Sequence, residues 1–330
     1  MKRRDFITLL SGATAWPLLA LARAQQSDPV RRIGALFSMA PDDPLARPRI
    51  AAFEQALQAL GWTVGRNLQI DYRWTAGDPK VHWTYATELL ALKPMLILAH
   101  TGMIAKVLQS LTGDVPIVFV NVLDPTANGL VASFARPGGN ITGFALSDFA
   151  LAAKWLELLK QIAPRTTRVT VIVDPHARAG FGQLDAIEAI AGPMKTDVRL
   201  VNARDPSEIE HGIAECARAP HGGLIVTPST PAVLHRRLII ALAARYELPA
   251  IHPFSYYAAD GGLIAYGPDL VQQYRQAASY VDRIFRGEKP ANLPVQAPTK
   301  YELVINLKTA EALKLAIPRA LLAAATEFIE

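Results

Sequence analysis

The histidines and the single cysteine are the side chains of this sequence best suited to metal binding or catalysis, and their spacing supports neither. No His-Glu-x-x-His pair and no Cys/His cluster occurs, although a zinc site needs such ligands in close spacing. The sequence also has neither a Gly-x-Ser-x-Gly nucleophile elbow nor a Gly-x-x-x-x-Gly-Lys phosphate loop. We therefore expect no catalytic residue, no metal and no cofactor, and an isolated core or surface role for each histidine.

One segment begins like a dinucleotide-binding fingerprint. Gly180 and Gly182 have the spacing of its first two glycines, but Asp185 stands where the third glycine belongs. The start of a helix or the flexibility of a loop explains these two glycines better than a dinucleotide-binding site does. Cys216 falls within a predicted helix, where a small buried side chain is a better interpretation than a reactive thiol.

Polar residues follow the predicted strands in both halves of the sequence. A helix that follows a strand of a parallel sheet begins at the carboxyl edge of that sheet, where ligands bind. Backbone N–H groups at helix N-termini stabilise an anion by about 0.3–1 kcal/mol, so this edge would suit a ligand carboxylate. The candidate ligand-binding residues of this kind are Ser38, Thr101, Gly102, Asp124, Thr227 and Ser229.

Asp124 has two interpretations. Its carboxylate would suit a ligand ammonium or hydroxyl group, or it would only cap the helix predicted after Pro125. Three tyrosines, Tyr256, Tyr257 and Tyr266, could cover an apolar or cationic part of a ligand. Of the adjacent pair, we expect one tyrosine to be a packing residue.

The elements that must position these residues alternate between short apolar runs and longer amphipathic segments. Several runs are apolar at consecutive positions, as expected of parallel strands covered on both faces. This rhythm predicts doubly wound α/β sheets with right-handed crossovers. The predicted strands are 33–39, 68–74, 95–99, 117–122, 169–173, 198–201, 224–227, 250–254 and 263–266, and the predicted helices cover 50–60, 79–92, 149–163, 205–218, 230–246 and 270–286.

Helix starts carry a repeated signature, in which a capping side chain precedes a proline suited to the first helical turn. These pairs begin at Asp43, Asp78, Asp124, Asp205 and Thr230. A break near 143–147 separates two blocks, 31–143 and 148–265, each with enough strands and helices for one sheet. We therefore predict two Rossmann-like lobes with parallel-rich sheets.

Residues 1–24 have the composition of a signal peptide. A basic start, Lys2-Arg3-Arg4, leads through an apolar stretch to an A-x-A cleavage site, Ala22-Arg23-Ala24, and the beginning fits the twin-arginine pattern. Removal takes away four basic residues and one acidic residue, which lowers the formal net charge from +5 to +2. We therefore expect an exported protein that is soluble after cleavage, with no nucleic-acid surface and, because Cys216 is the only cysteine, no internal disulfide.

A long, ordered succession of motifs resembles a known family. Pro116-Ile117-Val118-Phe119 leads to Asp124-Pro125, then to Gly129-Leu130-Val131, and then to Arg136-Pro137-Gly138-Gly139-Asn140 with Thr142-Gly143. Leu60-Gly61-Trp62, Ala99-His100-Thr101-Gly102 and the segment 261–267 extend the match over essentially the whole chain after the leader. The sequence resembles the substrate-binding proteins of ABC transporters, tryptophan/tyrosine type, with the periplasmic-binding-protein type I fold.

The resemblance implies a ligand cleft between the two lobes and no catalysis. It also implies a periplasmic monomer, which closes around a small solute such as an amino acid or related carboxylate. Its partners would be an ABC permease and ATPase complex at the membrane. The N-terminal lobe would comprise 31–143 plus about 266–294, and the C-terminal lobe 144–265 plus about 295–330. Chain crossings near 143–147, 265–268 and 295–300 would join them.

Two residues depart from the family pattern. Asp174 precedes Pro175 where relatives often have Asn-Pro, so Asp174 is a further candidate ligand-binding residue, and His100 replaces a smaller residue. Two alternatives stay open: a ligand-sensing protein that presents its ligand to a receptor, and an exported α/β hydrolase that uses Asp124 or Asp174 with a histidine.

Overall fold

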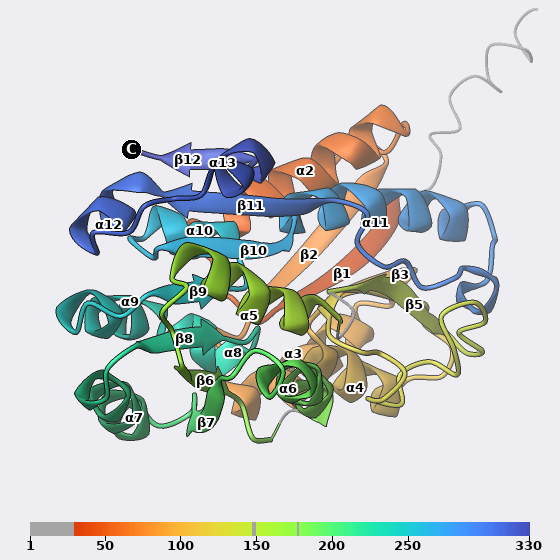
Figure 1. Cartoon of the computed structure of the whole chain (residues 1–330). Helices are drawn as coiled ribbons and strands as arrows, with labels where there is room; N and C mark the ends of the chain where they lie inside the picture. The colour runs from red at the N-terminus through yellow and green to blue at the C-terminus, as the bar shows by residue number, and fades with distance from the viewer. Residues whose placement is uncertain (1–29, 147–149, 177) are drawn as a thin grey trace, which may run out of the picture.

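A computed structural model describes residues 30–146, 150–176 and 178–330, and the predicted leader at residues 1–24 lies outside them. The described residues form two α/β sheets with helices on both faces (Figure 1). This arrangement confirms the predicted fold class, two lobes whose sheets consist mainly of parallel strands.

The first sheet is entirely parallel, with the strand order β2-β1-β3-β4-β5. Its strands are β1 (Arg31–Phe37), β2 (Leu68–Trp74), β3 (Leu96–His100), β4 (Ile117–Val122) and β5 (Ile141–Ala145). Every residue of β3 is buried, which explains why this strand is apolar at consecutive positions.

Helices cover both faces of the first sheet. Its helices are α2 (Ala46–Ala59), α3 (His82–Ala91), α4 (Gly102–Leu111) and α11 (Leu270–Phe285). The helices α2 and α11 lie side by side and pack on one face around Phe37 and Tyr274 (Figure 1). On the other face, α3 and α4 pack around Leu89 and Phe119. The late helix α11 therefore belongs to the core of the first lobe.

The second sheet has the strand order β12-β11-β10-β9-β8-β6-β7. Its strands are β6 (Arg168–Val173), β7 (Asp197–Asn202), β8 (Gly222–Val226), β9 (Ala250–His252), β10 (Ile264–Pro268), β11 (Tyr301–Asn306) and β12 (Glu327–Ile329). β11 runs antiparallel to β10, and the other neighbouring strands are parallel.

The helices of the second lobe also lie on both faces of their sheet. They are α5 (Ala150–Ile162), α6 (Arg178–Ala191), α7 (Pro206–Arg218), α8 (Thr230–Leu234), α9 (Arg236–Arg245), α10 (Ser255–Ala259), α12 (Leu307–Ala312) and α13 (Arg319–Ala324). α5 and α6 pack on one face around the buried Trp155, and α7 and α9 pack on the other around Ile213. Cys216 is buried on this second face, as predicted. Across the described ranges, no helix has the length and apolar character needed to span a membrane.

All nine predicted strands are present, but three strands were not predicted: β5, β11 and β12. β5 is a short run that contains Thr142 and Gly143, and β12 has only three residues, so neither has a clear strand pattern. The predicted helices also omitted α4, α6 and the short α10, α12 and α13. Gly180 and Gly182 lie within α6, which excludes the strand-to-helix turn of a dinucleotide fingerprint.

Two of the five predicted helix starts are confirmed. Asp78 accepts a hydrogen bond from the backbone N–H of Lys80 at 2.9 Å and begins a 3₁₀ turn, η1 (Pro79–Val81), that leads into α3. Asp205 accepts from the backbone N–H of Ser207 at 2.8 Å and begins α7. In both cases the following proline occupies the first turn, where its missing N–H is not needed.

Of the other three helix starts, those at Asp43 and Asp124 were wrong, and the start at Thr230 was correct in place but not in its capping residue. Asp43 accepts from the backbone N–H of Leu45 and closes a turn before α2. The side chain that caps α8 is Ser229, one residue before Thr230. Asp124 is followed by turns and not by a helix. An aspartate before a proline stabilises a turn by the same local hydrogen bond that caps a helix, so the pair alone does not distinguish them.

The described elements change lobes three times along the chain. These changes lie between β5 and α5, between β10 and α11, and between a 3₁₀ turn, η2 (Pro290–Asn292), and β11. Gln296 exchanges two backbone hydrogen bonds with the end of β5, at 2.8 and 3.0 Å, and Lys300 pairs with Asp269 at 2.8 Å. The three crossings are therefore tied together by hydrogen bonds. The lobe boundaries drawn from the family resemblance stay a prediction.

Candidate functional site

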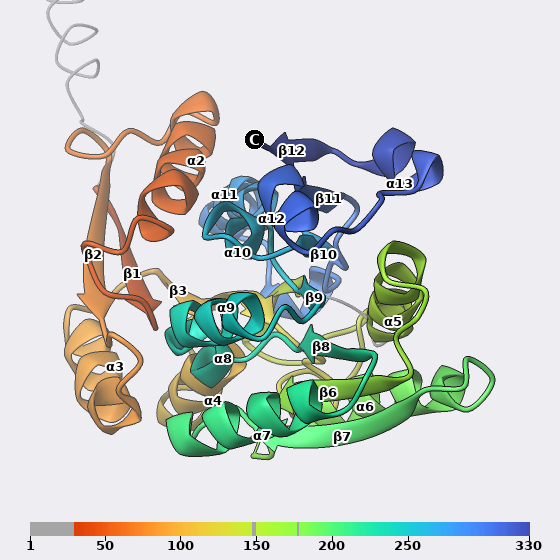
Figure 2. The same cartoon turned by 60° about the vertical axis from the view of Figure 1, so that its left-hand side comes forward.

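A cavity of about 510 Å³ lies between the two lobes. Its wall is built from the carboxyl ends of β1, β3 and β4 in the first sheet and of β6, β8 and β9 in the second. Figure 2 shows α8 and α9 of the second lobe next to the carboxyl end of β1. Ligands of open α/β sheets bind at this edge, so the cavity is the candidate site.

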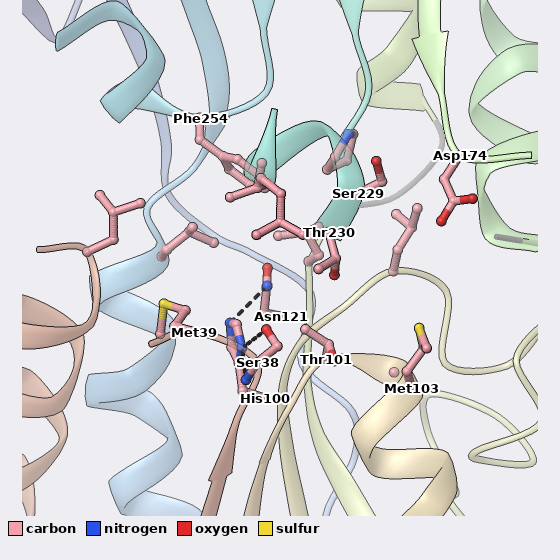
Figure 3. Close-up of a pocket in the computed structure, with 18 of the residues that line it drawn as sticks. Ser38, Met39, His100, Thr101, Met103, Asn121, Asp174, Ser229, Thr230 and Phe254 are labelled. Carbon is pink, nitrogen blue, oxygen red and sulfur yellow. Dashed lines mark hydrogen bonds between the residues drawn. The ribbon is translucent and has the colours of Figure 1, made fainter. Parts of the chain in front are cut away.

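Three polar side chains from three neighbouring strand ends form a network in the first lobe (Figure 3). Nδ2 of Asn121 lies 3.1 Å from Nε2 of His100, and Nδ1 of His100 lies 2.8 Å from Oγ of Ser38. An amide nitrogen only donates, so Nε2 accepts and Nδ1–H donates to Ser38. The backbone nitrogen of Ser38 lies farther from Nδ1, at 3.4 Å. Oδ1 of Asn121 is buried and has no protein partner within the described residues.

His100 is a neutral residue of the cavity wall. Its side chain is only 3% exposed and its ring lies 5.8 Å from the ring of Phe37. Burial lowers the pKa of His100 to about 3, and the nearby positive charge of Arg49 acts in the same direction. The expectation of an isolated role for this histidine was therefore wrong, because β3 places it inside the polar network.

The backbone at the end of β3 is strained. Thr101 has φ +85° and ψ 155°, a backbone region that residues other than glycine rarely occupy. Asn121, at the end of β4, also has a positive φ, +58°. Such strain costs about 1–3 kcal/mol per residue and is common at binding sites. Thr101 precedes α4 without giving it a side-chain cap, so the first N–H groups of α4 have no cap at the cavity wall.

The second lobe contributes an ion pair and a helix start. Arg204 donates to both oxygens of Asp174, from Nε at 2.6 Å and from a terminal nitrogen at 2.9 Å. This bidentate geometry satisfies most of the Asp174 carboxylate, which is itself buried. Ser229 accepts from the backbone N–H of Ala232 at 3.3 Å and orders the start of α8.

Apolar side chains form much of the remaining wall. Met39 and Met103 come from the first lobe, and Phe254 comes from the second (Figure 3). Leu146 and Leu270 lie next to the lobe crossings. The cavity therefore combines a few directed polar groups with an apolar surface, as is typical of small-molecule sites.

Arg49 and Tyr256 contact each other across the cavity. The Cζ atom of Arg49, on α2, lies 5.9 Å from the centre of the Tyr256 ring, on α10. Arg236 lies 5.9 Å from the same ring and is paired with Asp260 at 2.9 Å. Burial raises the pKa of Tyr256, although both arginines oppose this, so the phenol stays neutral. Side chains of both lobes therefore meet in the structure.

Six of the ten predicted ligand-binding residues line the cavity. They are Ser38, Thr101, Gly102, Asp174, Ser229 and Tyr256. Their contact with a ligand stays a prediction. The structure brings them together because each follows a parallel strand and these strands end at the facing edges of the two sheets.

Four predicted residues do not line this cavity. Thr227 is buried and donates to the backbone oxygen of Ile172 at 2.9 Å. Tyr257 is fully buried in the core of the second lobe, so it is the packing residue of the tyrosine pair. Tyr266 stacks on Tyr301, away from the cavity. Asp124 accepts from two backbone N–H groups of its own turn.

Sequence reasoning missed Arg49, Asn121, Arg204 and Arg236. Arg49 lies within the first turn of α2, where an arginine normally faces solvent. Asn121 interrupts an otherwise apolar strand, and this polar residue was a usable signal. Arg204 and Arg236 have no distinguishing sequence pattern, and only the tertiary fold brings them to the cavity. No group of three or more metal-binding side chains occurs in the ranges that the structure covers.

We expect Asp124→Ala to lower stability by about 0.5–2 kcal/mol, because two backbone N–H groups lose their acceptor. Ligand affinity should stay within twofold, since Asp124 lies outside the cavity wall. Chemical denaturation and calorimetric titration measure the two quantities. A tenfold loss of ligand affinity at unchanged stability would contradict this prediction and show that Asp124 contributes to ligand binding.

Comparison with known proteins gives consistent matches over most of the chain. The sequence model of the ABC transporter substrate binding proteins matches residues 45–329. A tyrosine-binding protein of Clostridioides difficile (strain R20291) is 27% identical over 267 residues, which are 79% of this chain and 75% of that protein.

Solved structures have the same architecture. A conserved domain protein from Vibrio cholerae superposes with a TM-score of 0.83 at 25% identity, covering 91% of this chain and 99% of the other. A domain from Streptococcus pneumonia in complex with L-Trp gives 0.83 at 21% identity, covering 91% and 100%. An adhesive substrate binding protein from Clostridium difficile, in a ligand-free, open structure, gives 0.71 at 23% identity, covering 91% and 99%.

Proposed function

Since the chain belongs to the family of ABC transporter substrate binding proteins, we propose that it is the extracytoplasmic binding component of an ABC importer. It captures a small organic solute, an amino acid or a related carboxylate, in the cavity between its lobes. It then presents the solute to a permease and ATPase complex at the membrane. The tyrosine-binding relative and the structural neighbour that holds L-Trp support this class of solute.

One observation carries this proposal: the cavity wall comes from both lobes. Ser38, His100 and Asn121 line it from the first lobe, and Asp174 and Ser229 line it from the second. A ligand that contacts both walls favours the closed arrangement, because an open protein offers only one set of contacts. The ligand is held by polar groups and apolar contacts and is released chemically unchanged.

The proposed export follows from the predicted leader. Residues 1–24 would direct the protein out of the cytoplasm and be removed, which leaves a monomer in the periplasm. The chain crossings would act as the hinge between a first lobe of 31–143 plus about 266–294 and a second lobe of the remaining residues. The three tied crossings and the placement of α11 in the first core support this division.

The test is a thermal-shift screen with amino acids, aromatic acids and nucleosides, followed by two measurements on each hit. A solute at one hundred times its dissociation constant stabilises the native state by about 2.7 kcal/mol, so the melting temperature should rise. Small-angle scattering should show a smaller radius of gyration with the solute present. Chromatography of the recovered solute should show a single unaltered compound, and turnover would contradict the proposal in favour of an enzyme.

A further inference from the structure

We propose that Arg49 pairs with a ligand carboxylate, and that the preferred ligand is an organic acid with no balancing ammonium group. The inference rests on the proposed binding function and names the ligand class of the same cavity. It follows from which charged groups of the cavity already have a partner in the protein.

Arg49 is a buried cation without a counter-ion. It lines the cavity from α2, is 6% exposed, and has one nitrogen 3.1 Å from the sulfur of Met39. Within the described residues, no carboxylate oxygen lies within 4.0 Å of its guanidinium. A buried guanidinium normally pairs with an anion. The thioether sulfur of Met39 is only a weak acceptor and does not replace one.

The other neighbours of Arg49 do not neutralise it. Tyr256 accepts a side-chain hydrogen bond from Arg49, and the contact with its ring contributes about 0.5–2 kcal/mol. Tyr256 and His100 are both neutral, so neither supplies a negative charge. The planar fork of a guanidinium fits the two oxygens of a carboxylate. A ligand carboxylate at Arg49 would therefore supply the missing anion.

The two acidic side chains of the cavity are already engaged. Arg204 holds both oxygens of Asp174. Asp43 accepts from the backbone N–H of Leu45 at 2.9 Å, and its charge acts on Arg236 in the other lobe. Three arginines and two aspartates line the cavity in total. A ligand ammonium would therefore compete with Arg204 for Asp174 and with a backbone N–H for Asp43, and the positive charge of Arg49 would repel it.

The rest of the wall indicates an apolar body for this acid. Met39, Leu146, Phe254 and Leu270 line the cavity and offer no charge. The preferred ligand is thus a monocarboxylate with an apolar or aromatic body. Because Arg49 also contacts Tyr256 of the second lobe, neutralising its charge would stabilise the closed arrangement of the lobes.

The experiment uses matched sets of three compounds with the purified protein. Each set contains an L-amino acid, the same acid without its ammonium group, and the amide of that acid. The sets are L-tryptophan, indole-3-propionate and indole-3-propionamide; L-tyrosine, 3-(4-hydroxyphenyl)propionate and its amide; and L-leucine, 4-methylpentanoate and its amide. In at least one set, calorimetric titration should show the acid binding ten times or more tighter than its amide, and no weaker than the amino acid.

Two variants then test the role of Arg49. Arg49→Gln should lower the affinity for that acid about 10- to 100-fold and leave the affinity for the amide nearly unchanged, because hydrogen bonds to charged groups contribute about 1.5–3 kcal/mol. Arg49→Lys keeps the positive charge but loses the planar pair of donors, so its affinity for the acid should fall less than that of Arg49→Gln. Arg47→Gln is the matched control, since Arg47 lies on the same helix and is exposed. Circular dichroism checks that each variant is folded.

The outcomes separate the inference from the proposed function. If an amino acid binds ten times tighter than its matched acid, or an amide binds as well as the acid, the ligand class is wrong and the binding function stands. If Arg49→Gln weakens the acid and its amide equally, the pairing of Arg49 with the carboxylate is wrong. If no compound of any set binds, the proposed capture of amino acids or related carboxylates fails, and the inference fails with it.

Discussion

Gly267→Ala should lower the free energy of unfolding by about 3 kcal/mol and also weaken ligand binding. A Cβ atom at this position would lie 1.8 Å from the backbone oxygen of Pro253, so the backbone must move. Pro253 directly precedes Phe254, which lines the cavity, and the displacement would therefore reach the binding wall. Chemical denaturation and ligand titration measure the two effects on the same sample.

Gly113→Ala is the matched control for this substitution. No atom lies within 4 Å of the position that its Cβ would take. Its stability should equal or slightly exceed that of the parent, because alanine reduces the freedom of the unfolded chain. Equal stability of the Gly267 and Gly113 variants would show that β9 and β10 tolerate the added methyl group.

Lowering the pH from 7 to 4 should remove a large part of the stability through two buried histidines. Burial lowers the pKa of His252 to about 3, and burial together with Arg49 lowers that of His100 to about 3. The unfolded chain takes up a proton at each residue below pH 6.5, and the folded protein does not. The unfolded state thus binds more protons between pH 6.5 and 3, so stability falls as the pH falls, by roughly 3 kcal/mol per histidine at pH 4.

His252→Leu isolates this effect away from the cavity. Both ring nitrogens of His252 are buried without a protein partner in the described residues, so an apolar side chain of similar size should be tolerated at pH 7. Below pH 6.5 the variant should gain roughly 1.4 kcal/mol per pH unit relative to the parent. Denaturation curves at four pH values measure this gain. Parallel pH profiles for parent and variant would contradict it.

Much of the fold could be predicted because burial leaves a clear sequence pattern. β3 and β4 are apolar at nearly every position, since helices cover both faces of their sheet. β5 and β12 could not be predicted in this way. β5 needs Gly143 because its backbone passes within contact distance of Phe119, and this close approach is visible only in the folded chain.

The candidate site could be predicted where its residues follow strands. Ser38 and Thr101 follow β1 and β3 of the first sheet, and Ser229 follows β8 of the second, so each lies at the carboxyl edge of its own sheet. Arg49 and Tyr256 lie on helices of different lobes, 207 positions apart, and only tertiary packing places them together. Tyr256 and Tyr257 have equal propensities, and the face that α10 buries decides which of them reaches the cavity.

The three chain crossings, tied by Gln296 and by the pair of Lys300 with Asp269, restrict how the lobes can separate. A single connection would permit twisting and sliding, but three adjacent connections leave mainly one rotational degree of freedom, about an axis through the bonded segments. A rotation about this axis would leave the hydrogen bonds between the crossing segments in place. Removing the Lys300–Asp269 ion pair by substitution would remove one of these restraints. The angle between the two lobes would then vary over a wider range.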